Sequence, residues 1–132
     1  MDDPLPLLFT DARAVRVTGV RDETWLRLVD VPRALAARGY EAAAGPLVIA
    51  VTDELLPANT GGYRIGADGV RRADDPADLS LGVAALASAY LGGTRFSALA
   101  QSGRVTQHRP GALAAADRLF ATPRAPFAGT SF

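Results

Sequence analysis

Apolar and polar positions in the first half of the chain follow patterns that are typical of strands. Residues 25–31 are rich in β-branched side chains and partly alternate, which predicts a strand. Residues 47–52 form a continuous apolar run, as expected of a strand buried on both faces. Residues 63–65 and 70–72 flank a turn with an Asp-Gly pair, which predicts a hairpin. A further short strand is predicted at residues 78–81.

Helical spacing dominates the second half, after one short helix at residues 33–38 that Pro32 opens and Gly39 ends. Apolar residues recur at helical spacing over 83–91, and Gly92-Gly93 ends that helix. Two more helices are expected. The first is capped by Thr94, carries Phe96, Leu99 and Ala100, and ends at Gly103. The second is opened by Pro110 and closed by Pro123, and one of its faces carries Leu113, Ala116, Asp117 and Phe120.

Strands followed by a run of helices indicate an α+β domain rather than a βαβ nucleotide-binding fold. The length of 132 residues corresponds to one domain, and a chain of this size buries about two-thirds of the surface that it exposes when unfolded. We divide it into a connector at residues 1–20, a domain at 21–122 and a C-terminal tail at 123–132. In the connector, Pro4 and Pro6 stand beside the apolar run Leu7-Leu8-Phe9, which we expect to pack on another surface.

Composition excludes several kinds of chemistry. The 14 basic and 14 acidic residues balance, whereas nucleic-acid binding needs a clustered basic surplus. Without cysteine there is no disulfide, thiolate nucleophile or zinc finger, and a single histidine cannot build a histidine-rich metal site. No apolar run approaches the ~20 residues of a membrane span. The acidic N-terminus is unlike a secretion signal, so we expect a cytoplasmic protein without a membrane partner.

No catalytic side-chain motif emerges from the sequence. His108, the single imidazole, has no evident partner and is expected to be solvated or to stand at a helix start. No Gly-x-Ser-x-Gly elbow places a serine nucleophile. Asp74, Asp75 and Asp78 surround Pro76, a pattern typical of a solvated turn. Arg71-Arg72 are interpreted as outward residues of the hairpin.

Two glycine-containing segments also fail as phosphate-binding loops. Residues 61–66 lack the spacing and the lysine of a P-loop and precede a strand rather than a helix. Residues 16–21 begin like the pyrophosphate loop of acetyltransferases, but the bulky Arg21 at the last position blocks close approach of the backbone.

The C-terminal tail is the most unusual segment. It carries Phe127 and ends on Phe132, although exposed termini usually fray. Two aromatic rings favour burial, and the α-carboxylate of Phe132 would be buried with them. An α-carboxyl group has an ordinary pKa of about 3.3–3.7, and apolar burial raises it toward a value that suits a general base.

Several segments together resemble the C-terminal domain of the enhanced-intracellular-survival (Eis-type) N-acetyltransferases, bacterial enzymes of the GCN5-related superfamily. The resemblance runs from about Asp11 to Phe132. The segments that carry it are residues 25–32, 56–63, 78–81, 89–93, 103–105 and 109–113, together with the tail residues Pro126, Phe127, Gly129, Thr130 and Phe132.

The resemblance implies a sterol-carrier-protein-like fold, which is a curved, mostly antiparallel sheet of about five strands with helices on one side. It implies that residues 1–20 connect to an upstream acetyltransferase region that this chain lacks. The α-carboxylate of Phe132 would then act as general base in the active site, with Phe127, Gly129, Thr130 and Ser131 positioning the tail. Ser131 stands where some members have an acidic residue.

The family's acetyl donor is acetyl-CoA, and its substrates are cationic amines: aminoglycosides, other polyamines and protein lysines. Its members are typically hexameric. No cofactor or metal is expected in this chain itself, which lacks a pyrophosphate loop and the family's general acid. Two alternatives to an inactive enzyme domain remain open: a free-standing sterol-carrier-like module that binds a lipid or another hydrophobic ligand, and a structural domain for oligomer assembly.

Overall fold

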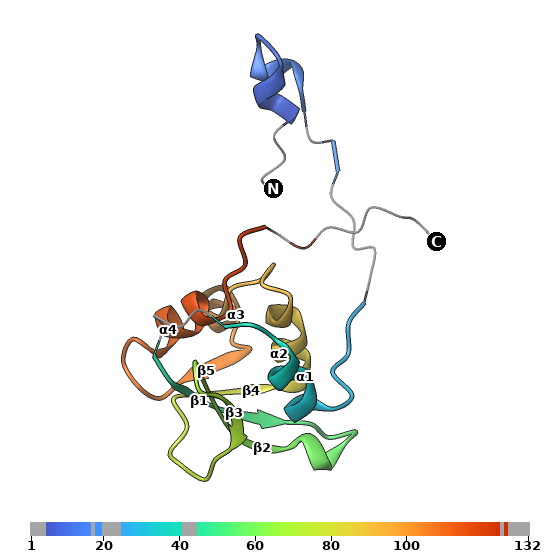
Figure 1. Cartoon of the computed structure of the whole chain (residues 1–132). Helices are drawn as coiled ribbons and strands as arrows, with labels where there is room; N and C mark the ends of the chain where they lie inside the picture. Colours follow the sequence, from blue (N-terminus) through green and yellow to red (C-terminus); the bar gives the residue numbers. More distant parts are fainter. Residues whose placement is uncertain (1–4, 17, 20–24, 41–44, 125, 127–132) are drawn as a thin grey trace.

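The computed structural model describes residues 5–16, 18–19, 25–40, 45–124 and 126. Its five-stranded sheet and its helices form an α+β fold (Figure 1). The strands are β1 (Leu47–Thr52), β2 (Gly61–Gly66), β3 (Gly69–Arg72), β4 (Leu79–Gly82) and β5 (Val105–Gln107). The helices are α1 (Val31–Ala37), α2 (Val83–Tyr90), α3 (Phe96–Gln101) and α4 (Ala112–Leu119), with 3-10 turns at Leu5–Leu8, Ala12–Ala14 and Pro57–Asn59.

The sheet has the strand order β3-β2-β1-β4-β5. The central strand β1 pairs antiparallel with β2 and parallel with β4, so that Ile49 lies opposite both Tyr63 and Leu79. The pairs β2–β3 and β4–β5 are antiparallel. The expectation of an α+β domain with a mostly antiparallel five-stranded sheet is therefore confirmed.

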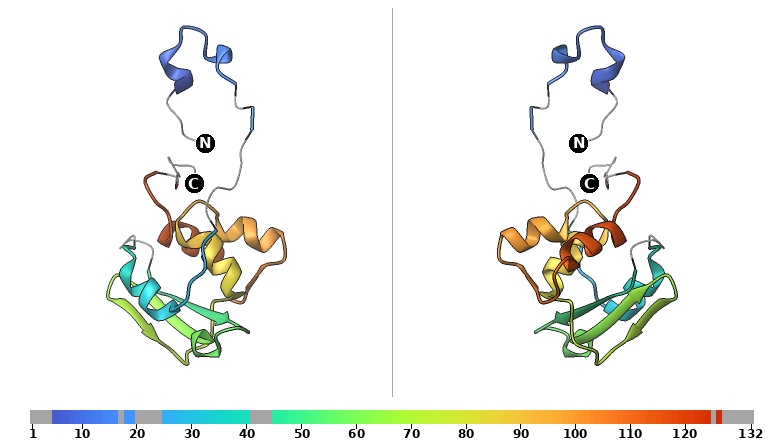
Figure 2. Two further views of the ribbon diagram at one scale, coloured as in Figure 1. Left: turned by 90° about the vertical axis from the view of Figure 1, so that its right-hand side faces the viewer. Right: turned by 90° about the vertical axis from the view of Figure 1, so that its left-hand side faces the viewer.

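The core lies between the sheet and its helices, which cover one face (Figure 2). Side chains alternate along a strand, so every second residue points into this layer. The fully buried side chains there include Leu35, Leu47, Ile49, Tyr63, Ile65, Leu79, Leu86 and Phe96. No helix of the described residues covers the other face (Figure 2). In the described part of the chain, no helix is long and apolar enough to cross a membrane.

The predicted strand at residues 25–31 is wrong. This segment pairs with no strand, and Trp25 is 88% exposed. Val31 instead begins α1, because the Asp30 carboxylate accepts the Arg33 N–H at 2.9 Å as an N-cap and Pro32 suits the first turn. The backbone of Val29 and Val31 bonds to the side chain of Asn59, which replaces the ladder of a strand.

Helix starts and one strand also differ from the predictions. Arg95, not Thr94, is the N-cap of α3, and the carboxylate of Asp117 accepts the Ser97 N–H at 3.2 Å. Helix α4 begins at Ala112 after Gly111, whose φ is +80°, rather than at Pro110. Strand β5 was not predicted, because it is only three residues long and buries a single side chain. The hairpin is confirmed, with the positive φ on Gly69.

Candidate functional site

The predicted catalytic tail falls outside the described residues. Phe127, Gly129, Thr130, Ser131 and Phe132 all lie beyond them. What the structure describes is the tail root, which we define as residues 120–124 and 126 with the Gly92-Gly93 turn that they contact. The tail root fixes where the predicted tail leaves the domain.

Gly92 and Gly93 follow the end of α2 and contact Thr122 and Pro126 of the tail root. A Cβ atom on Gly92 would lie 2.6 Å from Oγ1 of Thr122, and one on Gly93 would lie 2.8 Å from Cγ of Pro126. Gly92 also has a φ of +81°, which residues with a side chain rarely adopt. The sequence predicted these glycines only as a helix stop. In the structure their missing side chains let the tail lie directly on the turn.

Arg38 ties the tail root to the rest of the domain. Its Nε donates to the carbonyl oxygen of Tyr90 at 2.7 Å, and its Nη2 donates to that of Phe120 at 2.5 Å. These carbonyls close α2 and α4, where a cation is favourable. The guanidinium also lies 4.7 Å from the centre of the Phe120 ring. Burial lowers the pKa of Arg38, and the neighbouring Tyr40 and Tyr90 oppose that shift.

Three aromatic rings pack together beside the tail root. Phe120 is 2% exposed and meets Phe96 edge-on at 4.8 Å and Tyr40 at 5.4 Å between ring centres. The Tyr40 hydroxyl donates to the Leu35 carbonyl at 2.8 Å, and the Tyr90 hydroxyl donates to the Ala34 carbonyl at 2.8 Å. Burial raises the pKa of Tyr40. The chain therefore enters the tail root from a buried aromatic cluster. Sequence analysis predicted neither this cluster nor the role of Arg38.

A second polar centre, the Asp53 hub, lies at the end of β1. We define it as Asp53 with its donors Arg27, Asn59, Leu55 and Leu56. The buried carboxylate accepts Arg27 Nη2 at 2.8 and 3.0 Å, Asn59 Nδ2 at 2.9 Å, and the backbone N–H groups of Leu55 and Leu56 at 3.1 Å each. The hydrogen bond from Asn59, with those from Leu56 and Arg27, lowers the pKa of Asp53 to about 2 against the effect of burial. Such a carboxylate stays ionised and is a weak base.

The remaining sequence candidates do not converge. His108 is exposed as predicted, with Nε2 2.9 Å from the Ser80 hydroxyl. Asp78 bonds to Arg109 Nε at 2.5 Å and to the Val48 N–H at 2.8 Å. Burial is the largest single influence on the pKa of Asp78 and raises it, but these hydrogen bonds together lower it. Among the described residues no group of three histidine or carboxylate side chains could hold a metal ion.

The acidic turn, the hairpin arginines and the two glycine-containing segments also do not come together in one site. Asp74 and Asp75 are exposed, as expected of a solvated turn. Strand β2 contains the predicted strand at 63–65 but begins at Gly61, so the glycines that were predicted to form a turn before it belong to the strand. Arg71 and Arg72 are both exposed, but Arg72 folds back and donates to the carbonyls of Thr60 and Ala58. The loop-like segment 16–21 lies partly outside the described residues.

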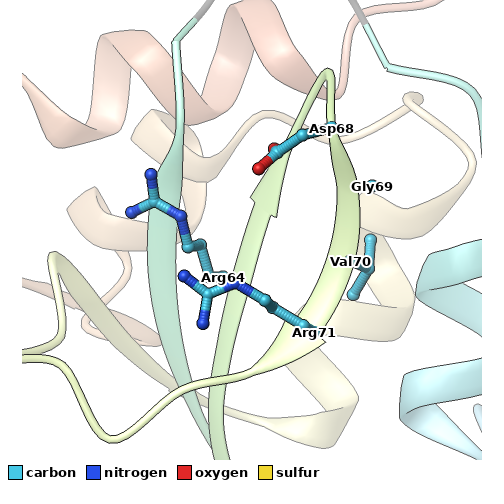
Figure 3. A pocket seen from close by; sticks show the side chains of 5 residues that line it. All are labelled: Arg64, Asp68, Gly69, Val70 and Arg71. Atoms are coloured by element: carbon cyan, nitrogen blue, oxygen red, sulfur yellow. The ribbon is translucent and has the colours of Figure 1, made fainter.

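Two hollows adjoin the β2–β3 hairpin. One, of about 40 Å³, is lined by Arg64, Asp68, Gly69, Val70 and Arg71 (Figure 3). The other, of about 310 Å³, shares Arg64 and Asp68 and adds Gly45, Pro46, Gly66 and Ala67. Both lie at the hairpin rather than in the layer between the sheet and the helices.

Comparisons with known proteins identify the family. Residues 31–129 match the sterol carrier protein domain. An uncharacterized N-acetyltransferase of Streptomyces griseus is 44% identical over 96% of this chain and 31% of its own length. N-acetyltransferase Eis of Mycobacterium tuberculosis is 37% identical over 91% of this chain and 30% of its own. The crystal structure of Eis1 from Mycobacterium abscessus superposes with a TM-score of 0.95 at 55% identity, over 100% of this chain and 34% of that one.

The chain thus spans about a third of the length of the relatives that it matches. The sterol carrier protein domain matches residues 31–129, and the superposition with Eis1 covers the whole chain. The matched region therefore includes both the Asp53 hub and the tail root. The order of strands and helices agrees with the fold that the resemblance implied. The chain belongs to the sterol carrier protein domain family and corresponds to the C-terminal, sterol-carrier-like domain of the Eis-type N-acetyltransferases.

Proposed function

We propose that this chain is the part of an acetyl-CoA-dependent amine N-acetyltransferase that supplies the general base and one wall of the substrate pocket. In this proposal Phe132 ends the enzyme and its α-carboxylate accepts a proton from a cationic amine. Aminoglycosides, polyamines and protein lysines are the substrate classes concerned. Acetyl-CoA binds to upstream domains, and the chain alone is inactive.

The chemistry requires a base because an ammonium group has no lone pair for attack on a thioester. A carboxylate removes the proton, the free amine attacks the carbonyl carbon, and the thiolate leaves and takes up a proton. A carboxylate in a low-dielectric pocket also attracts a cationic substrate. Asp53 is unsuited to this role, because its donors hold its pKa at about 2. We assign the role to the α-carboxylate of Phe132, because apolar burial would raise its pKa toward a value that suits a general base.

The tail root is the observation that carries this proposal. Pro126 lies against Gly93, and Thr122 Oγ1 donates to the Arg124 carbonyl at 2.8 Å, so the direction of the tail is set before the last six residues begin. Six residues reach at most about 20 Å when extended. The carboxylate of Phe132 can therefore serve an active site on a neighbouring domain while the tail stays fixed at its base. Phe127, Gly129, Thr130 and Ser131 guide it within that range.

Exposed apolar side chains support a contact with upstream acetyltransferase domains. Leu7 and Leu8 are 83% and 77% exposed, Trp25 is 88% exposed and Leu55 is 71% exposed. These side chains belong to separate segments, and large exposed apolar side chains are candidates for contacts with another domain. We assign them to contacts with the upstream two-thirds of the enzyme, and assembly into a hexamer and a cytoplasmic location belong to the same proposal.

A free-standing lipid-binding module would need an apolar cavity, commonly of about 300–1,000 Å³. The hollow of about 310 Å³ is lined by Arg64 and Asp68 and lies at the hairpin rather than in the core. No observation therefore favours lipid binding over acetyl transfer.

The proposal is tested by joining the chain to its upstream domains and measuring amine acetylation with and without Phe132. General bases contribute about 10²–10⁴-fold to rate, so we expect kcat to fall by at least about 100-fold, with the KM for acetyl-CoA unchanged. The deletion still ends in an α-carboxylate, but on Ser131 and one residue short. The variant Phe132→Ala, which keeps the α-carboxylate at position 132 and removes only the ring, is the matched control and should retain more activity than the deletion. Equal turnover of the intact and the shortened enzymes would refute the role of the carboxylate.

A further inference from the structure

Two arginines stand side by side on the face of the sheet that no helix covers. Arg64 and Arg71 are directly opposite each other in the β2–β3 register. Their side chains run to the same side of the hairpin, whereas Val70 points the other way (Figure 3). Like charges that face each other across a strand pair are destabilising. The sheet keeps this arrangement although smaller or neutral residues would avoid the repulsion.

Neither arginine forms an ion pair among the residues that the structure describes, although the charge of Arg64 contributes to lowering the pKa of Asp78. The ion pairs found there involve Arg13, Arg27 and Arg109 only. The Nε atom of Arg64 is shielded from solvent and has no hydrogen-bond acceptor. Buried donors of this kind are rare and call for an explanation, such as a missing ion.

The nearest acidic groups do not fill the role of a counterion. Both oxygens of Asp78 are already engaged, one by Arg109 Nε and the other by the Val48 N–H. The Asp68 carboxylate lies over Gly66, where a Cβ would come 2.7 Å from its Oδ1, and forms no ion pair within the described part of the chain. Asp74 and Asp75, beyond the end of β3, are exposed and also form none there.

Two hollows beside Arg64 and Arg71 offer space for a ligand. The smaller one, of about 40 Å³, is bounded by both arginines and Asp68. The larger one, of about 310 Å³, continues past Arg64 to Pro46, and its volume is at the lower end of the range for small-molecule sites. The glycines at positions 45, 66 and 69 line these hollows and add no side chain to them.

We propose that Arg64 and Arg71 bind the phosphate group of a small hydroxylated phosphate ester. A guanidinium presents its N–H groups as a planar fork that matches two phosphate oxygens. Two such cations balance a phosphate dianion, and the free Nε–H of Arg64 supplies one of the donors. The Asp68 carboxylate lines both hollows and accepts a hydrogen bond from a hydroxyl group of the ester. The site shares no residue with the tail root and stands whether or not the proposed acetyl transfer is correct.

The experiment titrates the 132-residue chain with inorganic phosphate and, separately, with glycerol 3-phosphate. Arginine Nε–H signals in the nitrogen–proton NMR spectrum are the readout. We expect the Arg64 and Arg71 signals to shift saturably, and glycerol 3-phosphate to bind more tightly than inorganic phosphate. Arg64→Gln or Arg71→Gln should raise either Kd about tenfold or more, because each removes charge-assisted hydrogen bonds. Arg64→Lys, which keeps the charge but not the fork, should weaken binding severalfold.

Two further variants separate a built site from general charge attraction. Arg118→Gln removes an exposed cation from α4 and should leave both Kd values unchanged. Asp68→Asn should tighten inorganic phosphate, because it removes a repulsion, and should reduce the advantage of glycerol 3-phosphate. The amide spectrum confirms that each variant is folded. The proposal is overturned if the Arg64 signal does not saturate, or if Arg118→Gln weakens binding as much as Arg64→Gln.

Discussion

The Asp53 hub and the tail root organise the domain in opposite ways. The hub is built from two side-chain donors and two backbone N–H groups around a buried carboxylate. The tail root depends on two side chains that are absent, because Gly92 and Gly93 leave room for Thr122 and Pro126. The difference teaches that saturated hydrogen bonding suits a buried polar centre, whereas glycine backbone without side chains suits a place where two chain segments lie in direct contact.

The largest stability effect is expected from Asn59→Ala in the hub. Asn59 is 3% exposed, and its side chain bonds to Val31, Val29 and Asp53. Removing it leaves buried groups without partners, so unfolding should require about 3 kcal/mol less in a urea titration. Gln101→Ala, on an exposed helix position, should change stability by less than about 0.5 kcal/mol. A loss below about 1 kcal/mol for Asn59→Ala would show that the hub is not a stability centre.

Arg38→Gln should have the next largest effect. It removes the donors to Tyr90 and Phe120 and the stacking on the Phe120 ring, which we expect to cost about 2 kcal/mol. Arg38→Lys should not restore the loss, because one ammonium group cannot match the planar fork. Arg33→Gln, an exposed position on the same helix, is the control for lost charge. Full stability of Arg38→Lys would contradict this account.

Gly93→Ala should affect catalysis more than folding. The new methyl group would collide with Pro126 and push the tail aside, whereas a Cβ on Gly39 meets nothing within 4 Å. In the enzyme with its upstream domains, we expect kcat to fall about tenfold, because small misplacements of a reacting group are costly. Stability should fall by only about 1 kcal/mol. Gly39→Ala is the matched control, and equal kcat values for the two variants would remove the tail root from the mechanism.

The smallest effect on stability near neutral pH is expected from the titration of Asp53, because its carboxylate is fully ionised there. Its pKa is lowered to about 2, from an ordinary value near 3.9 in the unfolded chain. Its contribution to stability is therefore complete above pH of about 4 and is lost as the pH falls toward 2. A carboxyl carbon NMR titration should show a midpoint near 2 for Asp53. A midpoint near 3.9 would mean that the hub does not stabilise the ionised form.

Local patterns predicted much of the fold. Strand β1, the β2–β3 hairpin and helix α2 were identified because their periodicity and their turn residues lie next to one another in the chain. Residues 25–31 misled the prediction, since β-branched side chains suit any extended segment and the pairing partner decides whether it is a strand. The Asp30 N-cap was the signal that could have corrected it.

The polar centres could not be predicted in the same way. Arg27 meets Asp53 across 26 positions, and Arg38 meets Phe120 across 82. No spacing rule connects such residues before the fold is known. The Arg64–Arg71 pair lies between these cases, because the hairpin predicts their opposition while only the structure shows that Arg64 Nε lacks an acceptor. The tail stood out through its two phenylalanines, the family resemblance implied its role, and that role remains a prediction.

The central claim is that a main-chain carboxylate at Phe132 is the base. The most direct measurement is the kcat for amine acetylation of an enzyme extended by one glycine beyond Phe132. This change keeps every side chain and moves the carboxylate by one residue, about 3.5 Å. We predict a fall in kcat of about 100-fold or more, with acetyl-CoA binding unchanged. A kcat equal to that of the unextended enzyme would contradict the account.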